Sequence, residues 1–122
     1  MEKVKKTLIL GASTNPGRYS FRAAHALTHH NHEIVPVGIK KGELVGKTIQ
    51  NNQKISEGID TITLYVSPKN QIEWYDFILN TKPKRIIFNP GTENEELRSL
   101  AEKENIETVY GCTLVMLSVG NY

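Results

Sequence analysis

The sequence predicts an α/β domain with a doubly wound, mostly parallel sheet of five strands and helices on both faces. Two observations lead to this class. Short, apolar, β-branched runs recur along the 122 residues, and segments with a helical spacing of apolar residues lie between them. Strands this apolar need cover on both faces. The chain length is typical of one domain, and we expect residues 1–122 to form it.

The expected strands and helices alternate along the chain. The strands are residues 7–10, 33–37, 61–66, 85–88 and 108–110. A helix is expected over 20–30, where Ala23, Ala24 and Leu27 form an apolar stripe, and Asn31 is a suitable left-handed stop.

Two further helices carry start signals. The one over 68–80 has Ser67 as its N-cap and Pro68 at its first position, where a missing N–H costs nothing. The other begins at a capping box formed by Thr92 and Glu95. The long stretch 39–58 is expected to be a loop with a short helical turn.

Composition excludes several classes. Fifteen Lys and Arg against thirteen Asp and Glu give a net charge of +2, too balanced for a general nucleic-acid binder. A single cysteine, Cys112, cannot form an internal disulfide or a thiolate zinc site within one chain. No run of eighteen apolar residues occurs, and residues 1–6 lack a signal-peptide pattern, so we expect a cytoplasmic protein without a membrane span.

The turn over 11–20, between the first strand and the first helix, is the expected anion site, because helix N-termini bind phosphate. The dinucleotide fingerprint GxGxxG matches only at Gly11, since Ser13 and Pro16 occupy the other glycine positions. The acidic residue that binds the ribose of NAD is also missing after the second strand. Lys40 and Lys41 stand there instead, and they suit a phosphorylated ribose, as in coenzyme A or NADP, or simply solubilise a turn.

Several of these residues together resemble a known family. Gly11-Ala-Ser13 with Pro16, Arg18 and Ser20 resembles the opening motif of the small stand-alone CoA-binding proteins, which are similar to the CoA-binding domain of the succinyl-CoA synthetase alpha subunit. The resemblance continues through Val35-Pro-Val37, Gly42–Gly46, Val66-Ser-Pro68 and Asn89-Pro-Gly91. It implies a Rossmann-like domain that binds the adenosine diphosphate part of coenzyme A, with no settled catalytic activity.

The resemblance also implies roles for individual residues. Gly11, Ala12 and Ser13 would approach the diphosphate, and Arg18 would donate charge-assisted hydrogen bonds to it. Val66, Ser67 and Pro68 would wall the adenine or pantetheine side. The expected binding residues are Gly11, Ala12, Ser13, Pro16, Arg18, Ser20, Lys40, Lys41, Val66, Ser67, Pro68, Asn89 and Gly91. This hypothesis requires the backbone amides of the first turn to be free for a pyrophosphate.

The leading hypothesis is a non-catalytic or regulatory module that binds coenzyme A or an acyl-CoA, because no catalytic set can be assembled from the local sequence. One alternative is an oxidoreductase or redox sensor that binds NAD(P) in the same crevice. Another is an enzyme that uses Cys112 for acyl transfer, although unpaired cysteines are usually buried packing residues. His25 and His29 share a helix face and are interpreted as a solvated helix end rather than a metal site. The sequence does not identify a protein partner.

Overall fold

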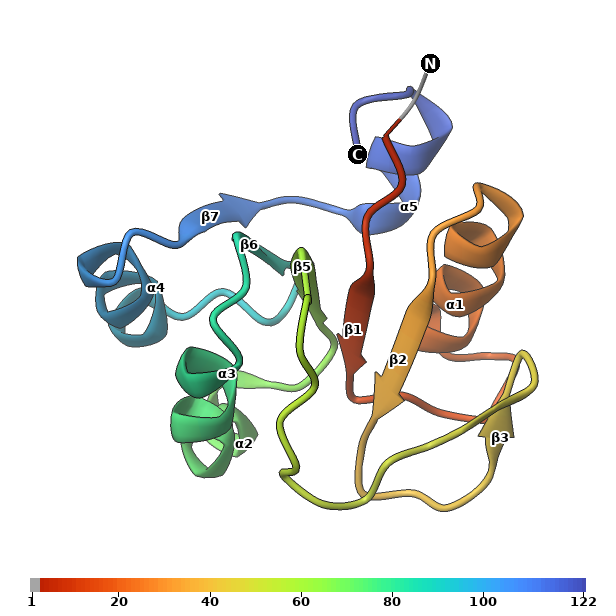
Figure 1. Cartoon of the computed structure of the whole chain (residues 1–122), viewed down its shortest axis with the longest axis horizontal. Coiled ribbons are helices and arrows are strands. Elements are labelled where there is room, and N and C mark those ends of the chain that lie inside the picture. Colours follow the sequence, from red (N-terminus) through yellow and green to blue (C-terminus); the bar gives the residue numbers. More distant parts are fainter. Residues whose placement is uncertain (1–2) are drawn as a thin grey trace.

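A parallel sheet forms the centre of the protein, seen here in a computed structural model that describes residues 3–122. Met1 and Glu2 lie outside the described residues. They are the first residues of the expected domain and of the segment 1–6, in which no signal-peptide pattern was found. All five sheet strands run parallel in the order β2-β1-β5-β6-β7 (Figure 1). They are β1 (Thr7–Leu10), β2 (Ile34–Val37), β5 (Thr61–Leu64), β6 (Arg85–Phe88) and β7 (Glu107–Tyr110).

Helices cover both faces of the sheet, as expected for buried strands. On one face Ile9 packs with Ala24 and Leu27 of α1 (Tyr19–His29) and with Leu117 of α5 (Thr113–Ser118). On the other face the neighbouring β1 residues Leu8 and Leu10 share a cluster with α3 (Tyr75–Thr81) and α4 (Glu95–Lys103). Successive strand residues therefore enter opposite cores. The predicted α/β Rossmann-like fold is confirmed.

The strand order reverses beside β1. The chain passes from β1 to β2 on one side and then crosses to β5 on the other side of β1. In open α/β sheets, ligands bind outside the carboxyl ends of the strands at such a reversal. In Figure 1 β1 and β2 point toward the lower part of the view, so their carboxyl ends lie there.

The loop after β2 differs from the expectation of a short helical turn. It forms a two-stranded antiparallel hairpin of β3 (Glu43–Leu44) and β4 (Lys47–Thr48). Val45 and Gly46 make the turn, both with positive φ, 51° and 76°. Two consecutive residues with positive φ are typical of the tight hairpin turn whose twist matches its strands.

Two helical expectations also need correction, and one further helix was not expected. The helix expected over 68–80 is divided into α2 (Pro68–Gln71), the 3-10 turn η1 (Ile72–Trp74) and α3. The capping box at Thr92 is wrong, because the N-cap of α4 is Asn94, which accepts a hydrogen bond from the amide of Leu97. The Thr92 hydroxyl donates instead to the carbonyl of Asn89 at 2.8 Å. Helix α5 is an additional element that the sequence analysis lacks.

The expected helix boundaries at Asn31, Ser67 and Pro68 agree with the structure. Asn31 ends α1 with a φ of 68°, and Ser67 and Pro68 are the N-cap and first residue of α2.

No helix among residues 3–122 is long and apolar enough to cross a membrane. Within the same range, no group of three His, Cys, Asp or Glu residues is placed to hold a metal ion. His25 instead stacks on Phe21, with ring centroids 4.6 Å apart.

Candidate functional site

A groove lies at the strand-order reversal, with a volume of about 350 Å³. Its walls come from the turn after β1, the first turn of α1 and the segments that follow β2, β5 and β6. We call it the switch-point groove. The residues that line it are Gly11, Ser13, Arg18, Tyr19, Ser20, Lys40, Tyr65, Ser67, Pro90, Gly91 and Thr92.

The backbone amides around the first turn divide into two groups. The amides of Gly11 and Ala12 both donate to the carbonyl of Val37, at 2.9 and 3.0 Å. The expectation that these two amides are free is therefore wrong, because the turn uses them to hold the end of β2. In α1 the first i to i−4 bond runs from Arg22 to Arg18. The amides of Tyr19, Ser20 and Phe21 precede it and have no intrahelical acceptor, so they are the donors that this helix end offers to an anion.

Two cationic side chains line the groove beside this helix end. Arg18 is the N-cap of α1 and is exposed. No ion pair or side-chain hydrogen bond within residues 3–122 engages its guanidinium. Lys40, at the end of the β2 segment, lies on the same groove. A helix N-terminus with two unpaired cations is an environment that favours a phosphate group.

Glycines let three backbone segments approach closely below the groove. Gly11 has a φ of 97°, and a Cβ there would lie 2.9 Å from the carbonyl oxygen of Tyr65. A Cβ at Gly38 would lie 3.0 Å from the carbonyl oxygen of Ala12. The turn after β1 is thus sandwiched between the segments after β2 and β5. This packing explains why glycine, and no larger residue, stands at both positions.

Asn89 connects the ends of three elements. Its Nδ2 donates to the Thr63 hydroxyl at 2.7 Å and to the Leu64 carbonyl at 2.8 Å. Its Oδ1 accepts from the amide of Thr113, the first residue of α5, at 2.9 Å. The side chain is 3% exposed, and all of these bonds are internal. Asn89 therefore acts by holding β5, β6 and α5 together rather than by offering a free polar group to a ligand.

Two smaller hollows adjoin the groove. One, of about 200 Å³, is lined by Tyr19, Tyr65, Asn89, Pro90, Cys112 and Leu114, and we call it the Cys112 cavity. Burial raises the pKa of Tyr65 to about 12, opposed by hydrogen bonds with Thr63 and Thr113, so its phenol is neutral at physiological pH. The other, the Trp74 hollow, has about 180 Å³ and is lined by Leu10, Gly11, Gly38, Ile39, Val66, Asn70, Glu73 and Trp74.

The structure brings together most of the residues expected at the site, but not all. Gly11, Ser13, Arg18, Ser20, Lys40, Ser67 and Gly91 line the groove, Val66 lines the Trp74 hollow, and Asn89 lines the Cys112 cavity. Pro16, Lys41 and Pro68 line none of the three. Ala12 packs into the core on the α1 face at 3% exposure.

Sequence reasoning missed several aromatic and apolar wall residues. Tyr65 and Pro90 each follow a buried strand, and that position at a carboxyl end was the signal that could have found them. Tyr19 lies next to the predicted helix start at residue 20, and that position was its signal. Leu114 had no usable signal, because α5 itself was not predicted.

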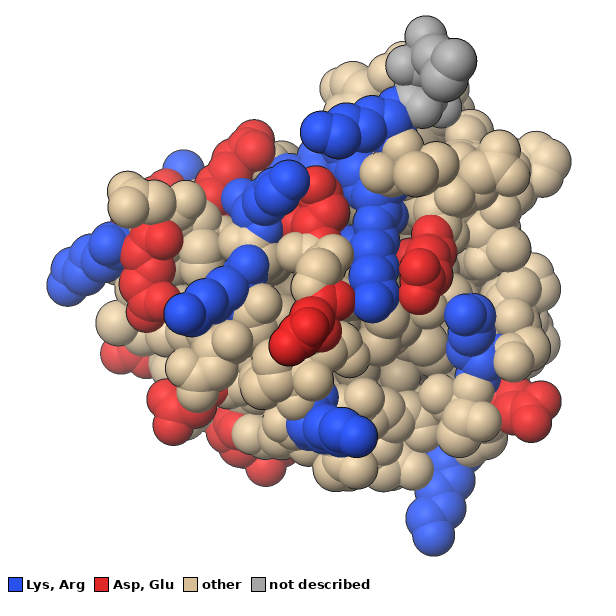
Figure 2. Space-filling view, viewed as in Figure 1, with Lys and Arg blue, Asp and Glu red and all other residues tan. Residues whose placement is uncertain are grey.

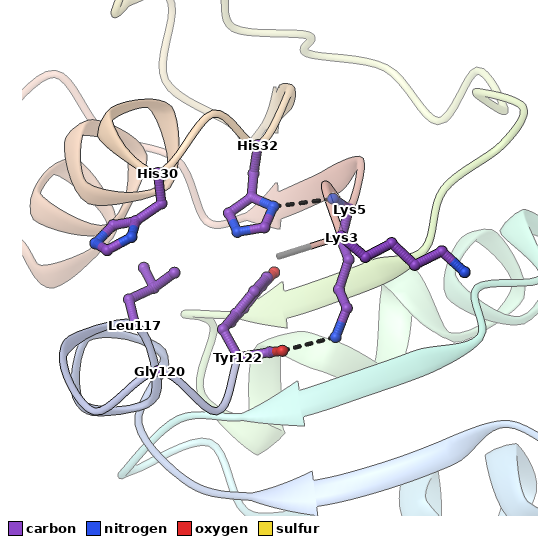
Figure 3. A pocket seen from close by; sticks show the side chains of 7 residues that line it. All are labelled: Lys3, Lys5, His30, His32, Leu117, Gly120 and Tyr122. Atoms are coloured by element: carbon purple, nitrogen blue, oxygen red, sulfur yellow. Dashed lines mark hydrogen bonds between the residues drawn. The ribbon is translucent and has the colours of Figure 1, made fainter. Parts of the chain in front are cut away.

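A separate cavity lies at the amino ends of the strands (Figure 3). The Lys5 amide donates to His32 Nδ1 at 2.9 Å, and the Lys5 ammonium donates to the Tyr122 carbonyl oxygen at 2.6 Å. The Tyr122 hydroxyl shares a 2.6 Å hydrogen bond with the Thr7 hydroxyl. These polar groups bind one another, so the contacts fasten residue 122 to the start of β1.

Surface charge supports a local anion site. Figure 2 shows Lys and Arg interspersed with Asp and Glu over one face of the molecule, without a broad surface of one sign. A mixed surface of this kind gives little general attraction to polyanions. The positive charges placed to bind an anionic ligand are therefore those of Arg18 and Lys40 in the switch-point groove.

The fold and the groove define an α/β Rossmann-like domain, with anion donors at the crevice where such domains bind ligands. A family model described as a CoA binding domain matches residues 5–118. The chain belongs to that family. A search of curated proteins gave no significant match.

Solved structures share the fold of this chain. A crystal structure titled only as an uncharacterized protein is 56% identical, with a TM-score of 0.98, and the match covers 99% of this chain and 100% of the other. A conserved hypothetical protein from Pyrococcus furiosus is 28% identical, with a TM-score of 0.80 and coverage of 91% and 97%. A hypothetical protein from Pyrococcus horikoshii OT3, 24% identical with a TM-score of 0.87 and coverage of 96% and 84%, is similar in fold.

Proposed function

We propose that the protein is a non-catalytic or regulatory module that binds coenzyme A or an acyl-CoA in the switch-point groove. The observation that supports this proposal most is the position of Arg18. Its guanidinium has no partner within residues 3–122, and it lies beside the first turn of α1, where the backbone amides have no intrahelical acceptor. The diphosphate lies at this helix end, where Arg18 and the amides of Tyr19 and Ser20 donate to its oxygens. Lys40 supplies a second positive charge for the phosphorylated ribose.

The hollows beside the groove support the two ends of the ligand. The Trp74 hollow adjoins the groove at Gly11, and its apolar wall residues, among them Ile39, Val66 and Trp74, suit an adenine ring. On the other side, Pro90, Gly91 and Thr92 form the wall along which the pantetheine arm extends. The donor set and the apolar hollows together fit a nucleotide with a long uncharged arm.

Coenzyme A is expected to stabilise the folded protein. Ligand at about 100 times its Kd adds about 2.7 kcal/mol to the unfolding free energy, which for a domain of this size raises the Tm by about 10 °C. Thermal melts with coenzyme A, ADP and NADP as separate ligands provide the measurement. Unchanged melting with coenzyme A at millimolar concentration would contradict the proposal, and stabilisation by NADP alone would favour the oxidoreductase alternative.

Replacing Arg18 with alanine is expected to weaken coenzyme A binding by about 1.5–3 kcal/mol, or roughly 10- to 150-fold in Kd, because a charge-assisted hydrogen bond is lost. Arg22→Ala is the matched control. Arg22 lies one turn further along α1, over the ring of Tyr19, and does not line the groove. Calorimetric titration of both variants measures the difference. Equal affinities for the two would show that Arg18 does not contact the diphosphate.

A further inference from the structure

The Cys112 cavity continues the switch-point groove toward α5. The two share Tyr19, Tyr65 and Pro90 as wall residues. The groove side carries the cations, and the cavity lies beyond these shared residues. A ligand whose phosphates lie at α1 and whose arm passes Pro90 therefore directs its far end toward the cavity.

The cavity offers no charge to that far end. None of its six lining residues is Lys, Arg, His, Asp or Glu, and burial keeps the Tyr65 phenol neutral. The polar atoms of Asn89 are already bonded to Thr63, Leu64 and Thr113. An ionised group that entered would lose water without gaining a partner, whereas an apolar group would gain burial.

The volume sets the size of the group that fits. An apolar cavity of about 150 Å³ in another protein holds a benzene molecule. The Cys112 cavity, at about 200 Å³, has room for a group slightly larger than this. An acyl chain of about four to six carbons has that size.

We propose that the Cys112 cavity binds the acyl chain of an acyl-coenzyme A and prefers uncharged chains of about four to six carbons. Acetyl groups, the free thiol and chains that end in a carboxylate bind less well. This inference rests on the proposed function, because the groove must hold the nucleotide for the chain to reach the cavity.

Titration calorimetry with coenzyme A and its acetyl, butyryl, hexanoyl and succinyl thioesters tests the preference. We expect the Kd to fall about two- to fourfold per added methylene from acetyl to hexanoyl. Succinyl-CoA, with as many acyl carbons as butyryl-CoA, should bind at least about tenfold more weakly than it. Binding of all five with one Kd overturns the cavity inference alone. Absence of binding by all five overturns the proposed function.

Variants of α5 locate the effect. Leu114→Trp fills the cavity and should abolish the advantage of hexanoyl-CoA over coenzyme A while leaving the Kd of coenzyme A within about twofold. Val115→Trp is the matched control, because Val115 is exposed and lies outside the cavity wall. A preference that survives in Leu114→Trp overturns the assignment of the chain to this cavity.

The native protein provides a readout that needs no variant. Cys112 is the only cysteine, so intact mass reports its alkylation directly. Hexanoyl-CoA, which has no free thiol, should slow alkylation by iodoacetamide at least about fivefold at saturation, because the chain covers the sulfur. ADP should leave the rate unchanged. Equal alkylation rates with hexanoyl-CoA and ADP overturn the inference.

Discussion

Replacing Gly11 with alanine is expected to destabilise the protein by about 2–5 kcal/mol. Two costs combine at this position. A φ of 97° strains any residue with a Cβ, at about 1–3 kcal/mol. The new methyl group would also lie 2.9 Å from the Tyr65 carbonyl oxygen and 3.0 Å from a Val66 methyl, an overlap that costs roughly as much again.

Gly58→Ala separates the two costs. Gly58 also has a positive φ, 75°, but nothing lies within 4 Å of the Cβ position. Gly58→Ala should therefore lower the free energy of unfolding by the backbone strain alone, about 1–2 kcal/mol. Urea unfolding of both variants gives the free energies. If the two lose the same amount, then the close approach of the β5 segment to Gly11 has no energetic weight, and our description of the turn is incorrect.

Replacing Asn89 with leucine is expected to cost about 2–4 kcal/mol of stability. Leucine has the same side-chain branching but a larger volume, and it makes none of the three internal hydrogen bonds of the Asn89 side chain. The largest part of this cost comes from the Thr113 amide, because Thr113 begins α5 and its N–H has no intrahelical acceptor. A buried donor left without a partner costs about 1–3 kcal/mol by itself.

Asn80→Leu serves as the matched control, because Asn80 lies in α3 with an exposed side chain. Its effect should stay within about 0.5 kcal/mol. Amide hydrogen exchange adds a local measurement, in which Asn89→Leu should lower protection in α5 more than in α3. Uniform loss of protection across both helices would argue that Asn89 does not specifically secure α5.

The central strands of the sheet could be predicted from the sequence, since burial on both faces leaves continuous apolar runs such as 86–88. The hairpin after β2 could not. Its turn places Val45, a β-branched residue, at positive φ, a conformation that local preference opposes and tertiary contacts impose. Thr92 is a similar case. Its sequence context matches a capping box, but in the structure its hydroxyl donates to the Asn89 carbonyl instead.

The site was predictable where it depends on chain position and less so where it depends on distant contacts. Arg18 and Ser20 follow from their place at the start of a helix after a strand. The occupied amides of Gly11 and Ala12 depend on Val37, which lies on another strand, and sequence spacing gives no sign of that bond. Cys112 and Leu114 line the adjoining cavity only because the Asn89 side chain holds the start of α5 at the carboxyl end of β6.

The bonds from Gly11 and Ala12 to the Val37 carbonyl have a consequence for kinetics. They fix the course of the main chain into α1 by contacts internal to the protein. An arriving anion then meets donors already oriented and immobilises little backbone, so most of the ordering entropy that weakens loop-based recognition is avoided. Association should accordingly proceed at a rate governed by diffusion and charge, without a slow rearrangement step.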